Sequence, residues 1–178
     1  MICATLSQLH ADIDARVQAI REAHPEWLCG KGCDGCCRKL AEIPQLTMAE
    51  WRLLQEGLAA LPLQRLQEIG RVMSALVGQN SHPIVCPLLN QSTNVCPVYA
   101  QRPVACRTYG FYIQRELGLY CNEIESRVAD GALADVVWGN HDAIDQRLAS
   151  LGEARALTTW FEHWQNGEFT PTLCALAD

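Results

Sequence analysis

Long apolar runs are missing from this sequence. No stretch approaches the about 18 consecutive apolar residues that a membrane-spanning helix needs. Residues 1–20 also lack the basic segment and the uninterrupted apolar segment that mark an export signal. We therefore expect a cytoplasmic protein that has no membrane partner.

Positive charge is also scarce. The chain has 14 Lys and Arg against 20 Asp and Glu, which gives a net charge of −6. Nucleic-acid-binding proteins carry a basic patch or stripe, so we expect no nucleic-acid partner. Common catalytic motifs are missing as well: there is no serine–histidine–carboxylate arrangement, no glycine-rich phosphate loop and no helix-borne pair of histidines. The sequence therefore predicts no catalytic residue and leaves enzymatic activity open.

Cysteine, in contrast, is abundant, with ten in 178 residues. A chain of this length can bury a core without disulfides. In a reducing compartment, clustered cysteines usually bind metal or take part in redox chemistry. The excess of cysteine therefore calls for a chemical explanation.

Eight of the cysteines form two groups. The first group lies in the string CGKGCDGCCRK, where glycines let the backbone curl and direct several sulfurs to one point. In the second group three cysteines are separated by nine residues each time, and one more follows. The predicted metal ligands are Cys29, Cys33, Cys36 and Cys37 of the first group and Cys86, Cys96, Cys106 and Cys121 of the second. Cys3 and Cys174 are isolated near the ends of the chain, and we expect them to be small buried side chains.

Eight thiols allow several metal arrangements. Two closed tetrahedral zinc sites, one four-cysteine iron–sulfur cluster (4Fe–4S) with spare thiols, or a mixture would all fit. Neighbouring Cys36 and Cys37 point in different directions, so one of them is expected to serve another metal, a redox step or packing. A thioredoxin-like pair at Cys33 and Cys36 would need βαβ units, and a radical enzyme would need a βα barrel; neither pattern is present.

Basic residues lie beside both cysteine groups. Lys31, Arg38 and Lys39 surround the first, and no Asp or Glu occurs in residues 69–115. Positive neighbours favour the thiolate, which is the form that binds metal. Arg102 and Arg107 flank Cys106, where they would either offset sulfur charge or be ordinary surface arginines.

A few other side chains could contribute to the predicted metal site. Tyr99 and Tyr109 are expected to cover the site as apolar lids. His82 could replace a cysteine in a zinc site, although a loop histidine without a metal role is the favoured interpretation. His141 and Asp145 lie one helical turn apart, and a plain surface contact is favoured for them.

Helical periodicity surrounds the cysteine-rich centre. The pattern predicts helices over residues 5–23, from Thr47 with a capping box to Glu50, from Pro62 to Gly78, and as two or three helices between residues 123 and 165. Residues 81–122 contain four prolines and predict loops, one short helix and a small hairpin within 108–120. We therefore predict a mainly α fold in a single domain of residues 1–178, with a loop-dominated metal-binding region at about 29–121.

The combined pattern resembles the CxxCxxCC family of cysteine-cluster proteins, also called YkgJ-like, which are described as zinc- or iron-chelating or iron–sulfur proteins. The matching segments are Cys29-x3-Cys33-x2-Cys36-Cys37, Cys86-Pro87-Leu88, Cys96-Pro97-Val98-Tyr99 and Arg102-Pro103-Val104-Ala105-Cys106-Arg107. The resemblance implies metal binding by these cysteines and supports Cys121 less strongly. A distant branch is associated with lysine methylation of flagellin, but this chain shows no S-adenosylmethionine-binding segment.

The sequence therefore predicts a metal-binding protein whose cysteines hold an iron–sulfur cluster or zinc, with electron transfer or metal handling as its function. Two alternatives remain open. One is a zinc-stapled module whose outer helices bind a partner protein, and the other is a cluster-dependent modifying enzyme.

Overall fold

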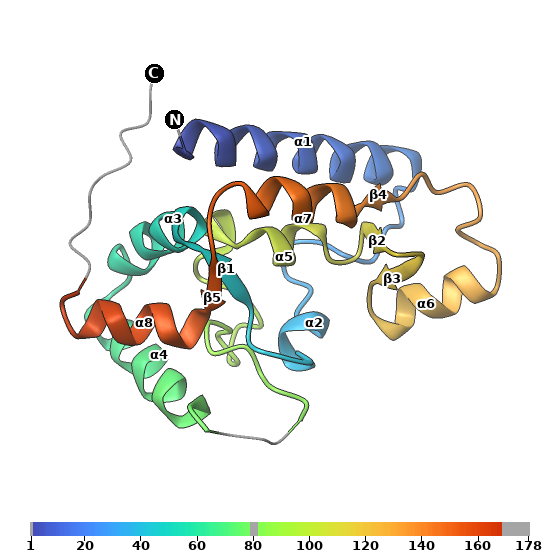
Figure 1. The fold of residues 1–178 in the computed structure, drawn as a ribbon. Helices are drawn as coiled ribbons and strands as arrows, with labels where there is room; N and C mark the ends of the chain where they lie inside the picture. The colour runs from blue at the N-terminus through green and yellow to red at the C-terminus, as the bar shows by residue number, and fades with distance from the viewer. Residues whose placement is uncertain (1, 79–81, 169–178) are drawn as a thin grey trace.

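The computed structural model describes residues 2–78 and 82–168, with the side chains of residues 2–4 left aside. Within these residues about half of the chain is helical, in eight α-helices, one 3₁₀-helix and two small sheets (Figure 1). The prediction of a mainly α fold is confirmed in this broad sense. None of the described helices is both long and apolar enough to cross a membrane.

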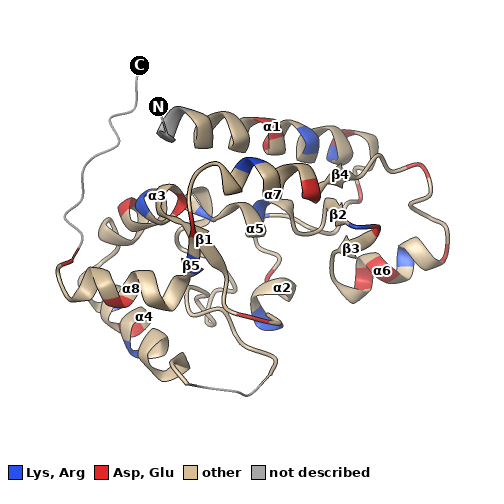
Figure 2. Cartoon of the chain, viewed as in Figure 1, with Lys and Arg blue, Asp and Glu red and all other residues tan. Residues whose placement is uncertain are grey.

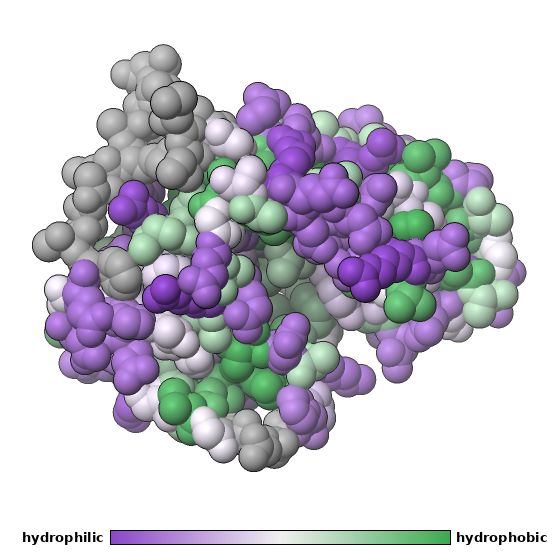
Figure 3. All heavy atoms as spheres, in the orientation of Figure 1, coloured by the Kyte–Doolittle hydropathy of each residue, from purple (hydrophilic) through white to green (hydrophobic). Residues whose placement is uncertain are grey.

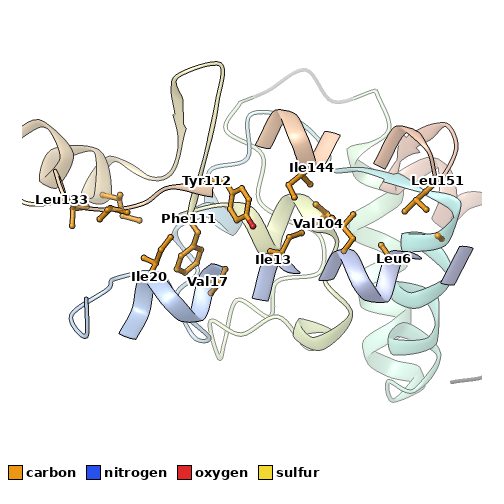
Figure 4. Packing of buried hydrophobic residues seen from close by; sticks show 14 residues of the cluster. Leu6, Ile13, Val17, Ile20, Val104, Phe111, Tyr112, Leu133, Ile144 and Leu151 are labelled. Atoms are coloured by element: carbon orange, nitrogen blue, oxygen red, sulfur yellow. The ribbon is translucent and has the colours of Figure 1, made fainter. Parts of the chain in front are cut away.

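The N-terminal helix α1 (Ile2–Ala23) forms one side of the first hydrophobic core. Its apolar residues recur every three or four positions, and five of them are buried: Leu6, Leu9, Ile13, Val17 and Ile20. They pack against α5 (Val104–Thr108), the start of the hairpin, and α7 (His141–Ala149) (Figure 4). The helix ends before His24-Pro25, as predicted.

A second core lies among α3 (Met48–Ala59), α4 (Leu63–Leu76) and α8 (Leu157–Gln165). The predicted capping box is present: the Glu50 amide donates to the Thr47 hydroxyl, and the Glu50 carboxylate accepts from the Thr47 amide. Strand β1 (Gln45–Thr47) pairs antiparallel with β5 (Ala154–Ala156). This pairing was not predicted, and it brings α8 against α3, where the Trp160 indole donates to the Leu46 carbonyl at 2.8 Å.

The predicted hairpin consists of β2 (Tyr112–Gln114) and β3 (Leu117–Leu119). Its two turn residues, Arg115 and Glu116, both have positive φ angles, 46° and 66°, as a twisted two-residue hairpin requires. The two-residue strand β4 (Gly139–Asn140) joins β2 in parallel. Such a short strand has no readable periodicity, which is why the sequence did not predict it. Helix α6 (Asn122–Ala129) follows the hairpin.

The cysteine-rich segments lie between the two cores. They contain the short helix α2 (Gly35–Arg38), the 3₁₀-helix η1 (Tyr99–Gln101), α5 and connecting loops. Antiparallel bridges join Leu40 to Ile84 and Asn90 to Val95. Cys29 and Cys121 pack against the first core, whereas Cys86 and Cys96 pack against the second. The cysteines therefore lie where the two halves of the fold meet.

Charged residues of both signs are interspersed over the described helices, with no continuous basic face in view (Figure 2). The face seen in Figure 3 is hydrophilic over much of its extent and is hollowed near its centre, where hydrophobic residues lie at the bottom of the hollow.

Candidate metal centre

Cys36 and Cys37 lie next to each other on α2 and belong to different surroundings. Successive residues of an α-helix project about 100° apart. Cys36 lines a pocket together with Cys29, whereas the Cys37 thiol is hydrogen-bonded to that of Cys86. The Cys36 and Cys37 thiols are also hydrogen-bonded to each other, so the expectation that these two sulfurs point in different directions stays a prediction.

Four cysteines gather on the Cys36 side and are called set A: Cys29, Cys33, Cys36 and Cys121. All four line one pocket, together with Tyr109 and Gly110. The Cys29 sulfur lies 3.6 Å from the Tyr109 carbonyl oxygen. A Cβ atom at Gly110 would lie 2.8 Å from the same sulfur, and Gly110 also has φ of +89°, so glycine is needed at this position.

Four cysteines gather on the Cys37 side and are called set B: Cys37, Cys86, Cys96 and Cys106. The backbone amide of Cys86 donates to the Cys37 carbonyl at 2.6 Å, which places these two residues side by side. Cys106 lies on α5, near enough to Cys36, Cys37 and Cys96 for their charges to affect its titration. All eight cysteines of the two sets are free thiols, and Cys33 alone among them is exposed.

Burial and crowding hold most of these thiols in the protonated form. Burial, together with the nearby sulfurs of Cys33 and Cys36, raises the pKa of Cys29 to about 12. The pKa of Cys37 is also raised to about 12, because the hydrogen bond to Cys86 and burial outweigh the lowering by Cys36. Burial likewise raises the pKa of Cys106. Nearby arginines do lower the pKa of Cys29 and Cys106, as expected for basic neighbours, but burial and the neighbouring sulfurs outweigh them.

The basic residues beside the first group explain part of this result. Lys31 and Lys39 are exposed, and the Arg38 guanidinium is paired with Asp34 and with the Asn94 side chain. Their charges are thus directed away from the sulfurs or neutralised by a carboxylate.

The chemistry of the donors fits zinc or an iron–sulfur cluster. Buried thiolates that crowd together repel one another, and a metal cation supplies the positive charge that relieves this repulsion. In the described part of the chain, no three His, Cys, Asp or Glu side chains already have the geometry of a metal site.

Arg102 and Arg107 have separate roles. The Arg102 guanidinium lies 3.8 Å from the centre of the Tyr99 ring, and its charge lowers the pKa of Cys96 against the larger effect of burial. Arg107 is not a surface residue. It is buried, pairs with Asp14 at 2.9 Å and donates to the Arg102 carbonyl. Arg107 therefore fastens α1 to the loop before α5.

The remaining predicted residues are more peripheral. Tyr109, which the sequence predicts to cover the cysteines, lines the pocket of set A. His82 is exposed. The Nδ1 atom of His141 lies 3.2 Å from the Asp145 carboxylate, which is the contact favoured from the sequence. Cys174 and the side chain of Cys3 fall outside the described part of the structure.

Two arginines near the cysteines were missed by sequence reasoning. Arg65 of α4 donates to the carbonyls of Leu88 and Leu89, just after Cys86-Pro87, and its charge affects Cys96. Arg21 of α1 donates to the Cys29 carbonyl at 2.9 Å. Both lie on helices outside the cysteine-bearing segments, and nothing in the local pattern distinguishes them from other helical arginines.

Comparison with known families gave one match. The model of the CxxCxxCC family, described as "Putative zinc- or iron-chelating domain", matches residues 28–127, which is more than half of the chain. The matched segment contains both sets of cysteines. No curated protein and no solved structure matched.

Proposed function

Because this chain belongs to the CxxCxxCC family of zinc- or iron-chelating domains, we propose that it handles metal through two four-cysteine centres. Set A forms one centre and set B forms the other, each as a complete ligand set for zinc or for an iron–sulfur cluster. No role as an enzyme is part of this proposal.

The division of the cysteines at the Cys36–Cys37 bond carries the proposal. Two sulfurs on adjacent residues cannot easily bind the same ion, and here each has its own group of three further cysteines. Cys36 also lies near Cys37, Cys96 and Cys106, so α2 brings the two centres close together. Eight thiols in two groups of four match the four-thiolate stoichiometry of closed sites.

The two kinds of metal would give the protein different chemistry. Zinc has no redox activity, so a zinc protein would store, transfer or be stabilised by metal, whereas an iron–sulfur cluster would add electron transfer. Metal handling is favoured over electron transfer, because Cys33 of set A is exposed, whereas all four cysteines of set B are partly buried.

Metal stoichiometry tests the proposal. The chain would be purified anaerobically with Cys3 and Cys174 replaced by serine, and metal, acid-labile sulfide and visible absorption would be measured on the same sample. We expect two centres per chain. Cys121→Ser and Cys106→Ser should each lower the number to one, and the serine background without further change is the matched control.

Two results would contradict the proposal. A chain that binds no metal would overturn it entirely, and a chain in which both variants keep full metal content would refute the assignment of these ligands. Iron with sulfide in stoichiometric amounts would favour electron transfer, and colourless protein with zinc would favour metal handling.

A further inference from the structure

We propose that the two centres differ in role: set A exchanges its metal with a thiol-bearing partner, whereas set B holds its metal as a permanent part of the fold. This inference rests on the function proposed above. It goes further by assigning metal exchange to one set of residues and by identifying Cys33 as the point of entry.

Access to solvent separates the two sets. Cys33 is exposed, whereas every cysteine of set B is at least partly buried. The pocket of set A also includes Leu28, which is 39% exposed, and the exposed residue Glu123. An incoming ligand can therefore reach a sulfur of set A without moving a core residue.

The loop around Cys33 faces open space. Gly32 has φ of +97°, and apart from neighbouring backbone no atom lies within 4 Å of where a Cβ at Gly32 or Gly35 would be. Within this loop the Cys33 amide donates to the Gly30 carbonyl at 3.1 Å, and the next residue, Asp34, pairs with Arg38. Cys33 is therefore open to an incoming ligand from solvent.

Set B is fixed by contacts from several elements. Cys86 is hydrogen-bonded to Cys37 through the backbone, and the adjacent bridge between Leu40 and Ile84 has two hydrogen bonds, of 2.9 and 3.0 Å. Arg65 of α4 donates hydrogen bonds to the carbonyls of Leu88 and Leu89, in the loop that follows Cys86. Removing a ligand from set B would therefore disturb the packing of the second core.

The exchange step is a ligand substitution and involves no redox change. A thiolate of the partner forms a bond to the metal, the bond between the metal and Cys33 breaks, and the Cys33 sulfur takes up the proton that the partner thiol released. Repetition at the other sulfurs of set A completes the transfer.

Zinc release from the full chain tests this division. The protein with Cys3 and Cys174 replaced by serine would be loaded with Zn²⁺ and mixed with excess colorimetric zinc chelator. We expect two phases of equal amplitude whose rates differ by at least about tenfold, the scale on which surrounding residues alter metal binding. In Cys33→Ser the fast phase should disappear while the slow phase remains.

Alkylation provides a second measurement that needs no variant. When the zinc-loaded chain is treated with iodoacetamide and digested for mass spectrometry, labels should appear first on Cys33 and the other cysteines of set A. Release of both zinc ions at one rate, or earlier labelling of set B, would overturn the division of roles. Failure to bind two zinc ions would overturn the zinc exchange, whereas the proposed function would fail only if no iron–sulfur centres formed either, so the two failures are distinguishable.

Discussion

Glu50 offers the sharpest test of how the fold supports set B, because one buried carboxylate stabilises the start of two helices. One carboxylate oxygen accepts from the amide and the hydroxyl of Thr47, both at 2.9 Å, and the other accepts from the Val104 amide at 2.9 Å. Glu50 is only 3% exposed. Val104 opens the helix that carries Cys106, so Glu50 positions a predicted metal ligand from another element.

The Glu50→Ala substitution should lower the free energy of unfolding by about 2–4 kcal/mol. Loss of the helix cap accounts for about 1 kcal/mol, and the unpaired, buried Val104 amide adds about 1–3 kcal/mol. Urea denaturation at fixed metal content measures the change. Glu56→Ala is the matched control, because Glu56 is exposed on the same helix and should change stability by less than about 0.5 kcal/mol.

Metal binding should reveal the link from Glu50 to set B. In Glu50→Ala, chelator competition should show weaker binding at set B than in the parent chain, with set A nearly unchanged. If Glu50→Ala matched Glu56→Ala in stability, the reasoning from the shared carboxylate would be refuted.

Three further predictions follow from the described side chains. Burial lowers the pKa of His10 from 6.5 to about 4. Protons therefore bind the unfolded chain more readily, and the free energy of unfolding should fall by about 1–2 kcal/mol as the pH drops from about 6.5 to about 4. The His10→Gln variant should show a flatter stability–pH profile over the same pH range. Gly110→Ala should lower the free energy of unfolding by about 1–3 kcal/mol, measured by heat or urea, and should weaken metal binding at set A. The control Gly32→Ala also has a positive φ angle, but its added Cβ would meet no atom within 4 Å, so it should lose less metal affinity. Arg65→Gln removes two hydrogen bonds to loop carbonyls and should weaken metal binding at set B about tenfold in a competition titration, while the exposed control Arg71→Gln should not.

Local signals in the sequence predicted the helices well. The capping box at Thr47 and Glu50, the apolar stripe of α1 and the stop before Pro25 depend on residues at most a few positions apart. The positive φ angles of Arg115 and Glu116 belong to a hairpin that the sequence indicated only by the alternation of its strands.

Contacts between distant segments were not predictable in the same way. The pairing of Leu46 with Arg155 and the ion pair between Arg107 and Asp14 join residues separated by more than ninety positions. The same limit applied to the cysteines. Spacing grouped them by position along the chain, whereas the fold places Cys121 with Cys29 and places Cys37 with Cys86.

The shared helix α2 predicts an order of metal loading. The donors of set B are held by backbone contacts before any metal binds, since Cys86 is already hydrogen-bonded to Cys37 and Cys106 sits on a helix. Binding there fixes Cys37 and therefore fixes Cys36, one residue away on α2, in position for set A. The first equivalent of Zn²⁺ should accordingly protect set B from iodoacetamide while Cys33 stays reactive, and protection of set A at one equivalent would show that α2 does not couple the two centres in this order.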